Sequence, residues 1–198
     1  MNQQVRILDI KRVYQGFYRV LRLMVRYPRF DGSLCPAHPL ECVERGEAVA
    51  ILLYDPQQDA VVLIRQFRIG AYLKQGQGWG LEIVAGGCEG TDDLATQARR
   101  EILEETGFVP YRLDYLFAYF SVPGLSSERV HLYLGLVDTT QTTTGRGGGL
   151  DHENEDIETL IMPFPEALAR IELGEVHSST GIMALQWLAL HKDALSLP

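Results

Sequence analysis

Cysteine is scarce in this sequence, and its spacing argues against a disulfide framework. The chain has three cysteines, Cys35, Cys42 and Cys88, which cannot all pair within one chain. None of them stands in a CxxC arrangement with another. The pattern favours a reducing compartment, and we expect a cytoplasmic protein.

Long apolar runs and an excess of positive charge are also missing. No apolar stretch approaches the length of a membrane span, and the N-terminus lacks the charged-then-apolar layout of a signal peptide, so no membrane partner is expected. The 18 Lys and Arg residues are outnumbered by 26 Asp and Glu residues, which gives a net charge of −8. Proteins that bind nucleic acid normally carry a basic surface, so we expect no such partner. An anionic substrate must then be received by a local basic site or by a metal ion.

The N-terminal residues 1–46 predict a small antiparallel β extension. Two runs rich in aromatic and β-branched residues, Val5–Tyr14 and Phe17–Tyr27, are separated by Gln15-Gly16, and Leu40–Arg45 is expected to return as a short strand. Such a piece is too small to bury a core alone. We therefore expect it to pack on the rest of the chain or on a second subunit.

Residues 47–198 predict a larger α/β domain. Apolar strands and amphipathic helices follow one another there, which indicates a mixed β-sheet in an α/β/α sandwich. A glycine-rich surface loop is expected over 70–80, and a polar loop over 139–156. The expected strands lie at 48–54, 60–67, 81–85, 111–122, 129–137 and 157–162, and the expected helices at 92–106, 165–173 and 179–191.

The stretch from Ala85 to Phe108 is the one around which this domain is organised. Gly86 and Gly87 open a loop, and Thr91 is the expected N-cap of a helix with Asp92 and Asp93 in its first turn. Gly107 is expected to end that helix. Its buried face is expected to carry the apolar residues that recur every four positions, Leu94, Ala98 and Ile102.

Three carboxylates gather in the last turn of the same helix. Glu101, Glu104 and Glu105 stand at i, i+3 and i+4, so their side chains share one face. They repel one another, and they lie near the negative end of the helix dipole, where cations are preferred. A hard divalent cation such as Mg²⁺ takes oxygen ligands of this kind. Arg100 is expected to hold one glutamate through a charge-assisted hydrogen bond.

The complete pattern resembles the Nudix box, G-x5-E-x7-R-E-U-x-E-E-x-G-U, in which U is a bulky apolar residue. Gly86 begins it, and Arg100-Glu101-Ile102, Glu104-Glu105 and Gly107-Phe108 complete it, so that eight of the nine specified positions match. Asp92 stands where the family has Glu, one methylene shorter and outside the glutamate cluster. The resemblance implies the Nudix fold, which agrees with the α/β/α sandwich expected from the elements.

Features outside the box look like the ADP-ribose pyrophosphatase branch of this family. They follow one another as RQFR at 65–68, the box, PGLSSER at 123–129, ENEDI at 153–157 and IMALQWLALH at 182–191. In that branch the N-terminal strands swap across a homodimer and the active site uses residues of both subunits, so the resemblance implies a homodimer. It divides the chain into a dimerising and substrate-binding extension, 1–46, and a Nudix hydrolase domain, 47–198.

The resemblance also assigns roles to individual residues. The implied reaction is hydrolysis of the pyrophosphate of ADP-ribose to AMP and ribose 5-phosphate with Mg²⁺, or with Mn²⁺ as the alternative cation. Glu153 is the expected base, and Glu104 and Arg100 complete the catalytic group. The expected metal ligands are the carbonyl of Ala85 with Glu101, Glu105 and Glu155. The expected substrate contacts are Arg68, Glu128, Phe17 and Tyr18, with Arg129 as the structural partner of Glu128.

Three alternatives remain open at this point. The ADP-ribose enzymes commonly carry arginines before the ERG turn, where this chain has His38-Pro39-Leu40-Glu41. The related GDP-mannose hydrolases share the GGG and EDI features, so a GDP-sugar or another nucleoside diphosphate sugar is the nearest alternative substrate. An 8-oxo-nucleoside triphosphate fits less well, because such enzymes usually lack the N-terminal extension. A Nudix-fold module that senses ADP-ribose or NAD without cleaving it is the third, although such modules typically lose box glutamates that are present here.

Overall fold

The structure, a computed structural model, describes residues 4–88, 93–141, 148–149 and 155–195. The chain forms two compact units, which are described separately here. Unit 1 contains residues 1–47 together with 120–129, and unit 2 contains residues 48–119 and 130–198. The segment 120–129 thus belongs to unit 1, whereas the expected division placed it in the larger part. The functional roles assigned to the two parts stay a prediction.

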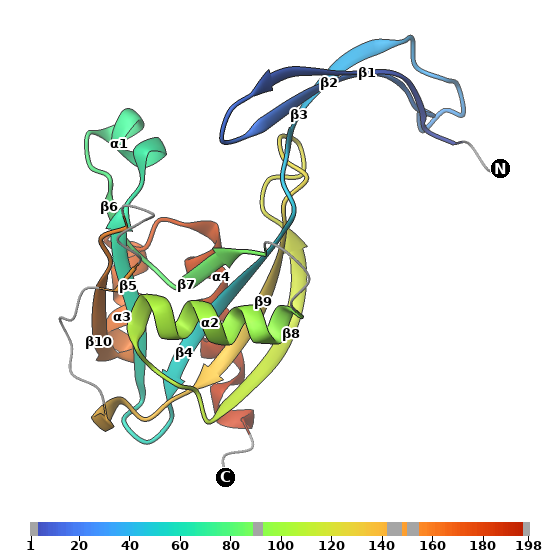
Figure 1. The fold of residues 1–198 in the computed structure, drawn as a ribbon. Coiled ribbons are helices and arrows are strands. Elements are labelled where there is room, and N and C mark those ends of the chain that lie inside the picture. The colour runs from blue at the N-terminus through green and yellow to red at the C-terminus, as the bar shows by residue number, and fades with distance from the viewer. Residues whose placement is uncertain (1–3, 89–92, 142–147, 150–154, 196–198) are drawn as a thin grey trace. The chain divides into compact units, whose positions relative to one another are not determined.

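Unit 1 is built on a three-stranded antiparallel sheet in the order β1-β2-β3 (Figure 1). Its strands are β1 (Arg6–Gln15), β2 (Arg19–Arg26) and β3 (His38–Glu44), close to the predicted ranges. Every residue of β1 is exposed, so the sheet has no core of its own on that strand. The segment 120–129 lies beside β3, where Val43 forms a bridge with Ser126.

Unit 2 contains a seven-stranded sheet whose central order is β10-β5-β4-β9-β8, with β6 beside β5 and β7 beside β4. Figure 1 shows β4 and β9 pointing the same way, while β5, β6, β7 and β10 pair antiparallel to their neighbours, so the sheet is mixed. The strands are β4 (Glu47–Asp55), β5 (Ala60–Phe67), β6 (Trp79–Glu82), β7 (Val84–Gly87), β8 (Arg112–Phe120), β9 (Arg129–Leu136) and β10 (Glu158–Pro163).

Helices cover both faces of this sheet, which confirms the predicted α/β/α sandwich. Helix α2 (Leu94–Thr106) lies on one face, and α3 (Phe164–Glu172) and α4 (Ser179–His191) lie on the other (Figure 1). Strand β4 supplies both cores because successive side chains point to opposite faces. Val49, Ile51 and Leu53 pack with α2, and Ala50, Leu52 and Tyr54 pack in the core that α3 and α4 cover.

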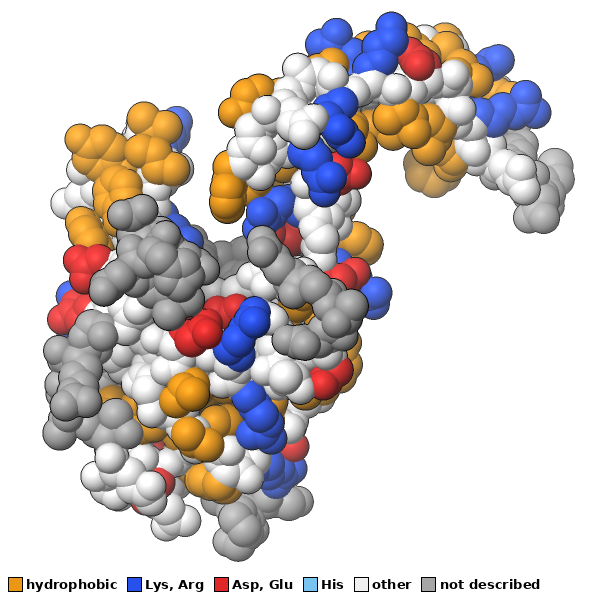
Figure 2. Space-filling model, in the orientation of Figure 1, with side chains coloured by type: hydrophobic (Ala, Val, Ile, Leu, Met, Phe, Trp, Pro, Cys, Tyr) orange, Lys and Arg blue, Asp and Glu red, His pale blue; other side chains and the backbone are white. Residues whose placement is uncertain are grey.

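The prediction of a loop over 70–80 is wrong. Residues Ile69–Gln75 form a short helix, α1, which ends at Gly76 in the left-handed conformation (φ 73°). Apart from Gly70 the segment has no Gly or Pro before Gly76, so about two helical turns can form there. The apolar side chains of α1 are exposed instead of buried, and Figure 2 shows them gathered at this tip of the molecule. The strand expected at 81–85 is likewise two strands, because β6 and β7 pair with different neighbours on either side of Ile83.

Helix α2 begins two residues later than predicted. Thr91 was the expected N-cap, but Asp93 takes this position, and its carboxylate accepts hydrogen bonds from the N–H groups of Ala95 and Thr96. A carboxylate cap satisfies two orphan donors and meets the positive end of the helix dipole. The C-terminal prediction is confirmed, since Gly107 follows the helix with φ 72°.

Two expectations from composition can be compared with the described residues. None of the three cysteines forms a disulfide bond there. Among the described helices, none combines the length and the apolar character that a membrane crossing requires.

Candidate active site

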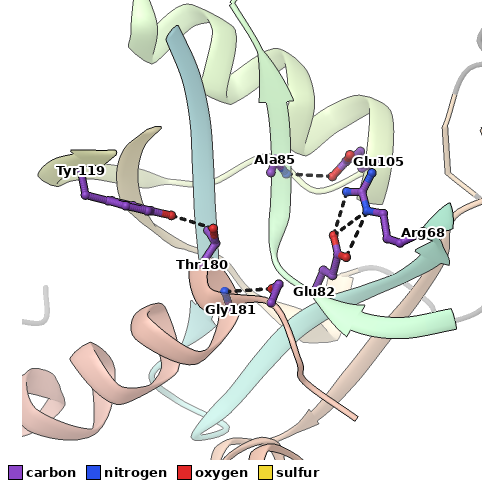
Figure 3. A network of polar contacts seen from close by, with 8 residues as sticks. Arg68, Glu82, Ala85, Glu105, Tyr119, Thr180 and Gly181 are labelled. Atoms are coloured by element: carbon purple, nitrogen blue, oxygen red, sulfur yellow. Dashed lines mark hydrogen bonds and ion pairs between the residues drawn. The ribbon is translucent and has the colours of Figure 1, made fainter. Parts of the chain in front are cut away.

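The glutamate cluster lies at the C-terminal end of α2, against strand β7. Glu105 is only 3% exposed, and its Oε2 accepts a hydrogen bond from the backbone N–H of Ala85 at 3.3 Å (Figure 3). Glu101, one turn earlier, is partly buried. Glu104 is partly buried as well, and its charge acts on Glu101. The helix therefore carries its carboxylates into the protein rather than out to solvent.

The surroundings of two of these carboxylates disfavour their charged form. Burial raises the pKa of Glu105 well above its ordinary value, and the negative charge of Glu101 raises it further. Burial is also the largest cause that raises the pKa of Glu101, with the charges of Glu104 and Glu155 acting in the same direction. A positive ion placed between these groups would stabilise the ionised forms.

Gly86, which was expected to open a loop but belongs to strand β7, lies directly on the Glu101 carboxylate. Gly86 pairs with Val49, whose side chain faces α2, so a side chain at position 86 would point the same way. A Cβ added there would lie 2.2 Å and 2.4 Å from the two carboxylate oxygens of Glu101. Only glycine leaves this space to the carboxylate, which gives the first position of the box a physical reason.

An arginine–glutamate pair lies beside the cluster. Arg68 follows β5 in an extended conformation, and its Nε and Nη2 donate to the carboxylate of Glu82 at 3.1 Å and 2.8 Å. Glu82 is 8% exposed and pairs across the strands with Ile64, whose side chain faces α2. Figure 3 shows Arg68 close to both Glu82 and Glu105.

The net effect of these neighbours is to strengthen the charge on Arg68. Burial alone lowers the pKa of its guanidinium, but the hydrogen bonds to Glu82 and the charges of Glu82, Glu105 and Glu155 outweigh burial and raise it. Arg68 therefore remains a fixed cation within the acidic cluster. An anionic substrate group has a partner at this point.

The end of α2 is anchored to two segments that follow much later in the chain. The N–H of Gly149 donates to the carbonyl of Glu104 at 3.1 Å, and the hydroxyl of Thr159 donates to the carbonyl of Glu105 at 3.2 Å. Gly148 pairs in both directions with the backbone of Ile157. A Cβ on Gly148 would lie 1.9 Å from the Glu105 carbonyl oxygen, so this close approach requires glycine.

The predicted site residues fall into three groups. Glu101, Glu104, Glu105, Ala85 and Arg68 lie together in unit 2, and the charge of Glu155 acts on Arg68, Glu101 and Glu105. Glu153 and Asp92 lie outside the described residues. Phe17, Tyr18 and Glu128 belong to unit 1.

Two expected partnerships are different in the structure. Arg100 was expected to bind a glutamate, but its Nη2 donates to Oε1 of Gln97 at 2.7 Å, and Gln97 in turn donates to Glu101. Arg129 was the expected partner of Glu128, yet Glu128 pairs with Arg45 at 3.3 Å. The two causes differ. Gln97 meets Arg100 as a neighbour three residues away on the same helix, whereas Arg45 reaches Glu128 across 83 residues through the fold.

A pocket of about 230 Å³ lies within unit 1. The guanidinium of Arg45 is over the ring of Tyr18 at 5.0 Å, in the geometry of a cation–π contact, and its Nε donates to Oε1 of Glu128. Phe17 contacts Tyr18 edge to face but is itself 88% exposed. The pocket is lined by Tyr18, Val43, Arg45, Ser121, Val122, Leu125, Ser126 and Glu128.

The oxygen-rich cluster fits a hard divalent cation, but not as a closed cage. Among the described parts of the chain, no three His, Cys, Asp or Glu side chains converge closely enough to hold a metal ion by themselves. Mg²⁺ sites in enzymes usually have one or two carboxylates and complete their coordination with water and substrate phosphates. Glu105, buried with one backbone donor and beside Glu101, has the chemistry of such a ligand.

Reasoning from sequence did not identify Glu82, Gln97 or Arg45. Glu82 gave the clearest signal, because a single acid within the apolar run Leu81–Ala85 must find a partner when buried. Gln97 stands four residues before Glu101 on the same helix face, at a position that the box leaves unspecified. Arg45 gave no signal of its own, since its partner is 83 residues away.

The fold and this cluster together define a Nudix protein. The family model described as the NUDIX domain matches residues 44–180, so the chain belongs to this family, and the resemblance inferred from the box is confirmed. It is a Nudix hydrolase, and enzymes of this family generally use divalent metal ions.

Individual relatives cover nearly the whole chain. It is 37% identical over 191 residues to the ADP-ribose pyrophosphatase of Escherichia coli (strain K12), with 96% of this chain and 90% of the relative covered. It is 30% identical over 190 residues to the GDP-mannose pyrophosphatase of Shigella flexneri, with 96% and 97% covered. A solved structure described as an ADP compounds hydrolase has the same fold, with a TM-score of 0.72 at 19% identity and 96% of each chain covered.

Proposed function

We propose that this protein hydrolyses the pyrophosphate bond of ADP-ribose to AMP and ribose 5-phosphate. The observation that carries the proposal is the pair of buried Glu105 and partly buried Glu101 at the end of α2, placed beside the Arg68 cation. The 37% identity to an ADP-ribose pyrophosphatase over almost the whole chain supports the substrate. The complete set of box glutamates favours catalysis over binding alone.

The proposed cofactor is Mg²⁺, with Mn²⁺ as the alternative. Glu101 and Glu105 would hold it, with Glu155 and the carbonyl of Ala85 as further ligands. The ion would neutralise the negative charge that develops on the pyrophosphate oxygens and would help to activate the attacking water. Such a role agrees with a site in which burial and mutual repulsion disfavour two uncompensated carboxylates.

The protein's own groups would position the substrate and accept the proton of the attacking water. Arg68, held on one side by Glu82, would bind a phosphate or the terminal ribose. Glu153 is the proposed base, which accepts a proton from the attacking water. The oxygen of that water bonds to phosphorus as the bridging P–O bond breaks. Glu104 and Arg100 would support the cluster. In unit 1, the Tyr18 ring, Phe17 and the Arg45–Glu128 pair offer contacts for a planar base and sugar hydroxyls.

A GDP-sugar is the second candidate substrate. The full-length match to a GDP-mannose pyrophosphatase supports it, as does His38–Glu41 in place of the arginines expected of ADP-ribose enzymes. The pyrophosphate chemistry is the same for both substrates. The difference lies only in the groups that bind the base and the sugar.

We also propose that the protein is a cytoplasmic homodimer. Strand β1 has no buried residue and exposes five large apolar side chains, Ile7, Leu8, Ile10, Val13 and Tyr14. Exposed apolar surface of this extent on a small sheet favours burial against a second copy of the chain.

The first test is hydrolysis of a substrate panel with Mg²⁺. ADP-ribose, GDP-mannose, UDP-glucose, NADH and 8-oxo-dGTP would be compared by kcat/KM, with the two products of each reaction identified. We expect ADP-ribose to be the best substrate and to yield AMP and ribose 5-phosphate. A preference for GDP-mannose would change the substrate and keep the mechanism, and tight binding of ADP-ribose without turnover would indicate a sensor.

Arg68→Lys tests the assignment of the cation. Lysine keeps the charge but loses the forked contact, and a hydrogen bond to a charged group contributes about 1.5–3 kcal/mol, so KM should rise about ten- to a hundredfold. Arg65→Lys is the matched control, because Arg65 pairs with Glu158 and its side chain belongs to the opposite face of β5. Steady-state kinetics would check both variants. An equal rise of KM in the control would remove Arg68 from the substrate site.

A further inference from the structure

Gln97 is the most buried polar residue in contact with the acidic cluster, and the Nudix box leaves its position unspecified. It lies in α2 and is 1% exposed. A primary amide in such a place must use its donors and its acceptor within the protein, since an unpaired buried polar group is costly. Its three hydrogen-bond partners therefore show what the residue does.

The three partners of the Gln97 amide are Glu101 of the acidic cluster, Arg100 of the same helix and Gly87 at the end of β7. Nε2 donates to the carbonyl of Gly87 at 3.2 Å and to Oε1 of Glu101. Oε1 accepts from Nη2 of Arg100 at 2.7 Å. The amide therefore connects strand β7, the box arginine and the box glutamate.

The orientation of this amide is fixed by its partners. If it were turned over, its oxygen would face two acceptors, the Gly87 carbonyl and the Glu101 carboxylate, and its NH₂ group would face the donor Arg100. Only one orientation satisfies all three contacts. Glu101 consequently meets a donor that cannot rotate away.

The same contacts restrict the Glu101 carboxylate from two sides. Gln97 holds Oε1, and Gly86 lies so close that a Cβ there would meet both oxygens. The Glu101 carboxylate is therefore held by a hydrogen bond on one side and lies against the backbone of Gly86 on the other. A carboxylate that is already ordered loses less conformational entropy when it binds a cation.

The choice of a neutral amide has an electrostatic consequence. If Arg100 bound Glu101 directly, its guanidinium would neutralise the charge that a divalent cation needs and would compete for the same oxygens. With Gln97 between them, Arg100 polarises the amide instead of pairing with the Glu101 carboxylate directly. Groups that orient a ligand in this way typically change metal affinity when they are removed.

We propose that Gln97 is a positioning residue of the metal site, which fixes Glu101 so that its carboxylate is presented to a divalent cation while Arg100 is kept one side chain away. This inference rests on the proposed function, because it takes Glu101 to be a metal ligand. It adds a residue that the box pattern does not specify.

The test is direct binding of Mn²⁺ without substrate, measured from the electron paramagnetic resonance signal of the free ion. Gln97→Met keeps the length and the helix propensity of the side chain but removes every hydrogen bond. We expect its affinity for Mn²⁺ to fall about tenfold or more, in the range typical for loss of an orienting group. Turnover should recover when Mg²⁺ is raised to saturation, because the ligands themselves remain.

Two controls separate positioning from general destabilisation. Leu185→Val, in the core on the opposite face of the sheet, should lower the melting temperature without weakening Mn²⁺ binding. Gln186→Met repeats the chemical change at an exposed position of α4 and should change neither. Equal weakening in Gln97→Met and Leu185→Val would overturn the proposal.

The remaining outcomes are equally decisive. Unchanged Mn²⁺ affinity in Gln97→Met would overturn the proposal, and if that variant does not fold, Gln97→Asn decides in its place, because its shorter amide cannot keep all three contacts. Glu105→Gln tests whether Mn²⁺ binds at the proposed metal site at all. If Mn²⁺ binds the unaltered protein and Glu105→Gln equally, or binds neither, the proposed metal site is wrong, and this inference fails with it.

Discussion

Glu105→Gln is expected to lower turnover by about three orders of magnitude while the protein stays folded. Charge stabilisation by a bound cation contributes several kcal/mol to such reactions, and each 1.36 kcal/mol is a factor of ten in rate. Glutamine has nearly the same shape, and its amide oxygen can accept the Ala85 N–H that Glu105 accepts now. Single-turnover kinetics with saturating Mg²⁺ would measure the loss.

The same substitution should stabilise the metal-free protein. Glu105→Gln is therefore expected to lower turnover and to raise the free energy of unfolding. Burial raises the pKa of Glu105 above the ordinary value of 4.5, so the folded chain holds this proton to higher pH than the unfolded chain. Stability contributed by the protonated form is therefore complete below about pH 4.5 and is lost as the pH rises toward the raised pKa. Glutamine does not ionise and avoids this loss.

Chemical denaturation in EDTA from pH 4 to pH 8 would check this. The difference in unfolding free energy between Glu105→Gln and the unaltered protein should be small at pH 4 and should grow with pH. A difference that is independent of pH would mean that ionisation of the buried Glu105 carboxylate does not destabilise the folded protein. Turnover retained in the variant would remove Glu105 from the metal site.

Gly86→Ala is expected to lower turnover by about a hundredfold, because a displacement of about 1 Å in a catalytic group has an effect of that size. The added methyl would occupy the place of the Glu101 carboxylate, 2.1 Å from its Cδ. That carboxylate is the end of a flexible side chain, so it can move, and the backbone need not. The melting temperature should change little.

Gly87→Ala is the matched control for this prediction. A Cβ on Gly87 meets no heavy atom within 4 Å, and the same type of substitution is made one residue away. We expect turnover close to that of the unaltered protein. Equal losses of turnover in Gly86→Ala and Gly87→Ala would indicate an effect on backbone flexibility. The close approach of Gly86 to Glu101 would then not explain the loss in Gly86→Ala.

The elements that were predicted correctly depend on contacts between near neighbours in sequence. The glutamates at i, i+3 and i+4 share a helix face by geometry alone, and Gly107 ends the helix because it adopts a left-handed conformation with ease. The apolar strands β4 and β5 were predicted within two residues, since their side chains are buried on both faces. Local chemistry decides features of this kind.

The errors concern choices among several local possibilities. Thr91, Asp92 and Asp93 are all good N-caps, and the position is decided by where the helix packs on the sheet. Helix α1 formed where glycines suggested a loop. In both cases the sequence allowed more than one structure, and packing selected among them.

The sequence by itself determined the family, the sandwich and the carboxylate cluster, because the box is a contiguous pattern whose spacing places its residues. Only the tertiary structure decided which groups surround that cluster. Arg68 meets Glu82 across 14 residues, Thr159 meets the Glu105 carbonyl across 54, and Arg45 meets Glu128 across 83. Pairs so far apart come together only through strand pairing and core packing, since no local spacing constrains them.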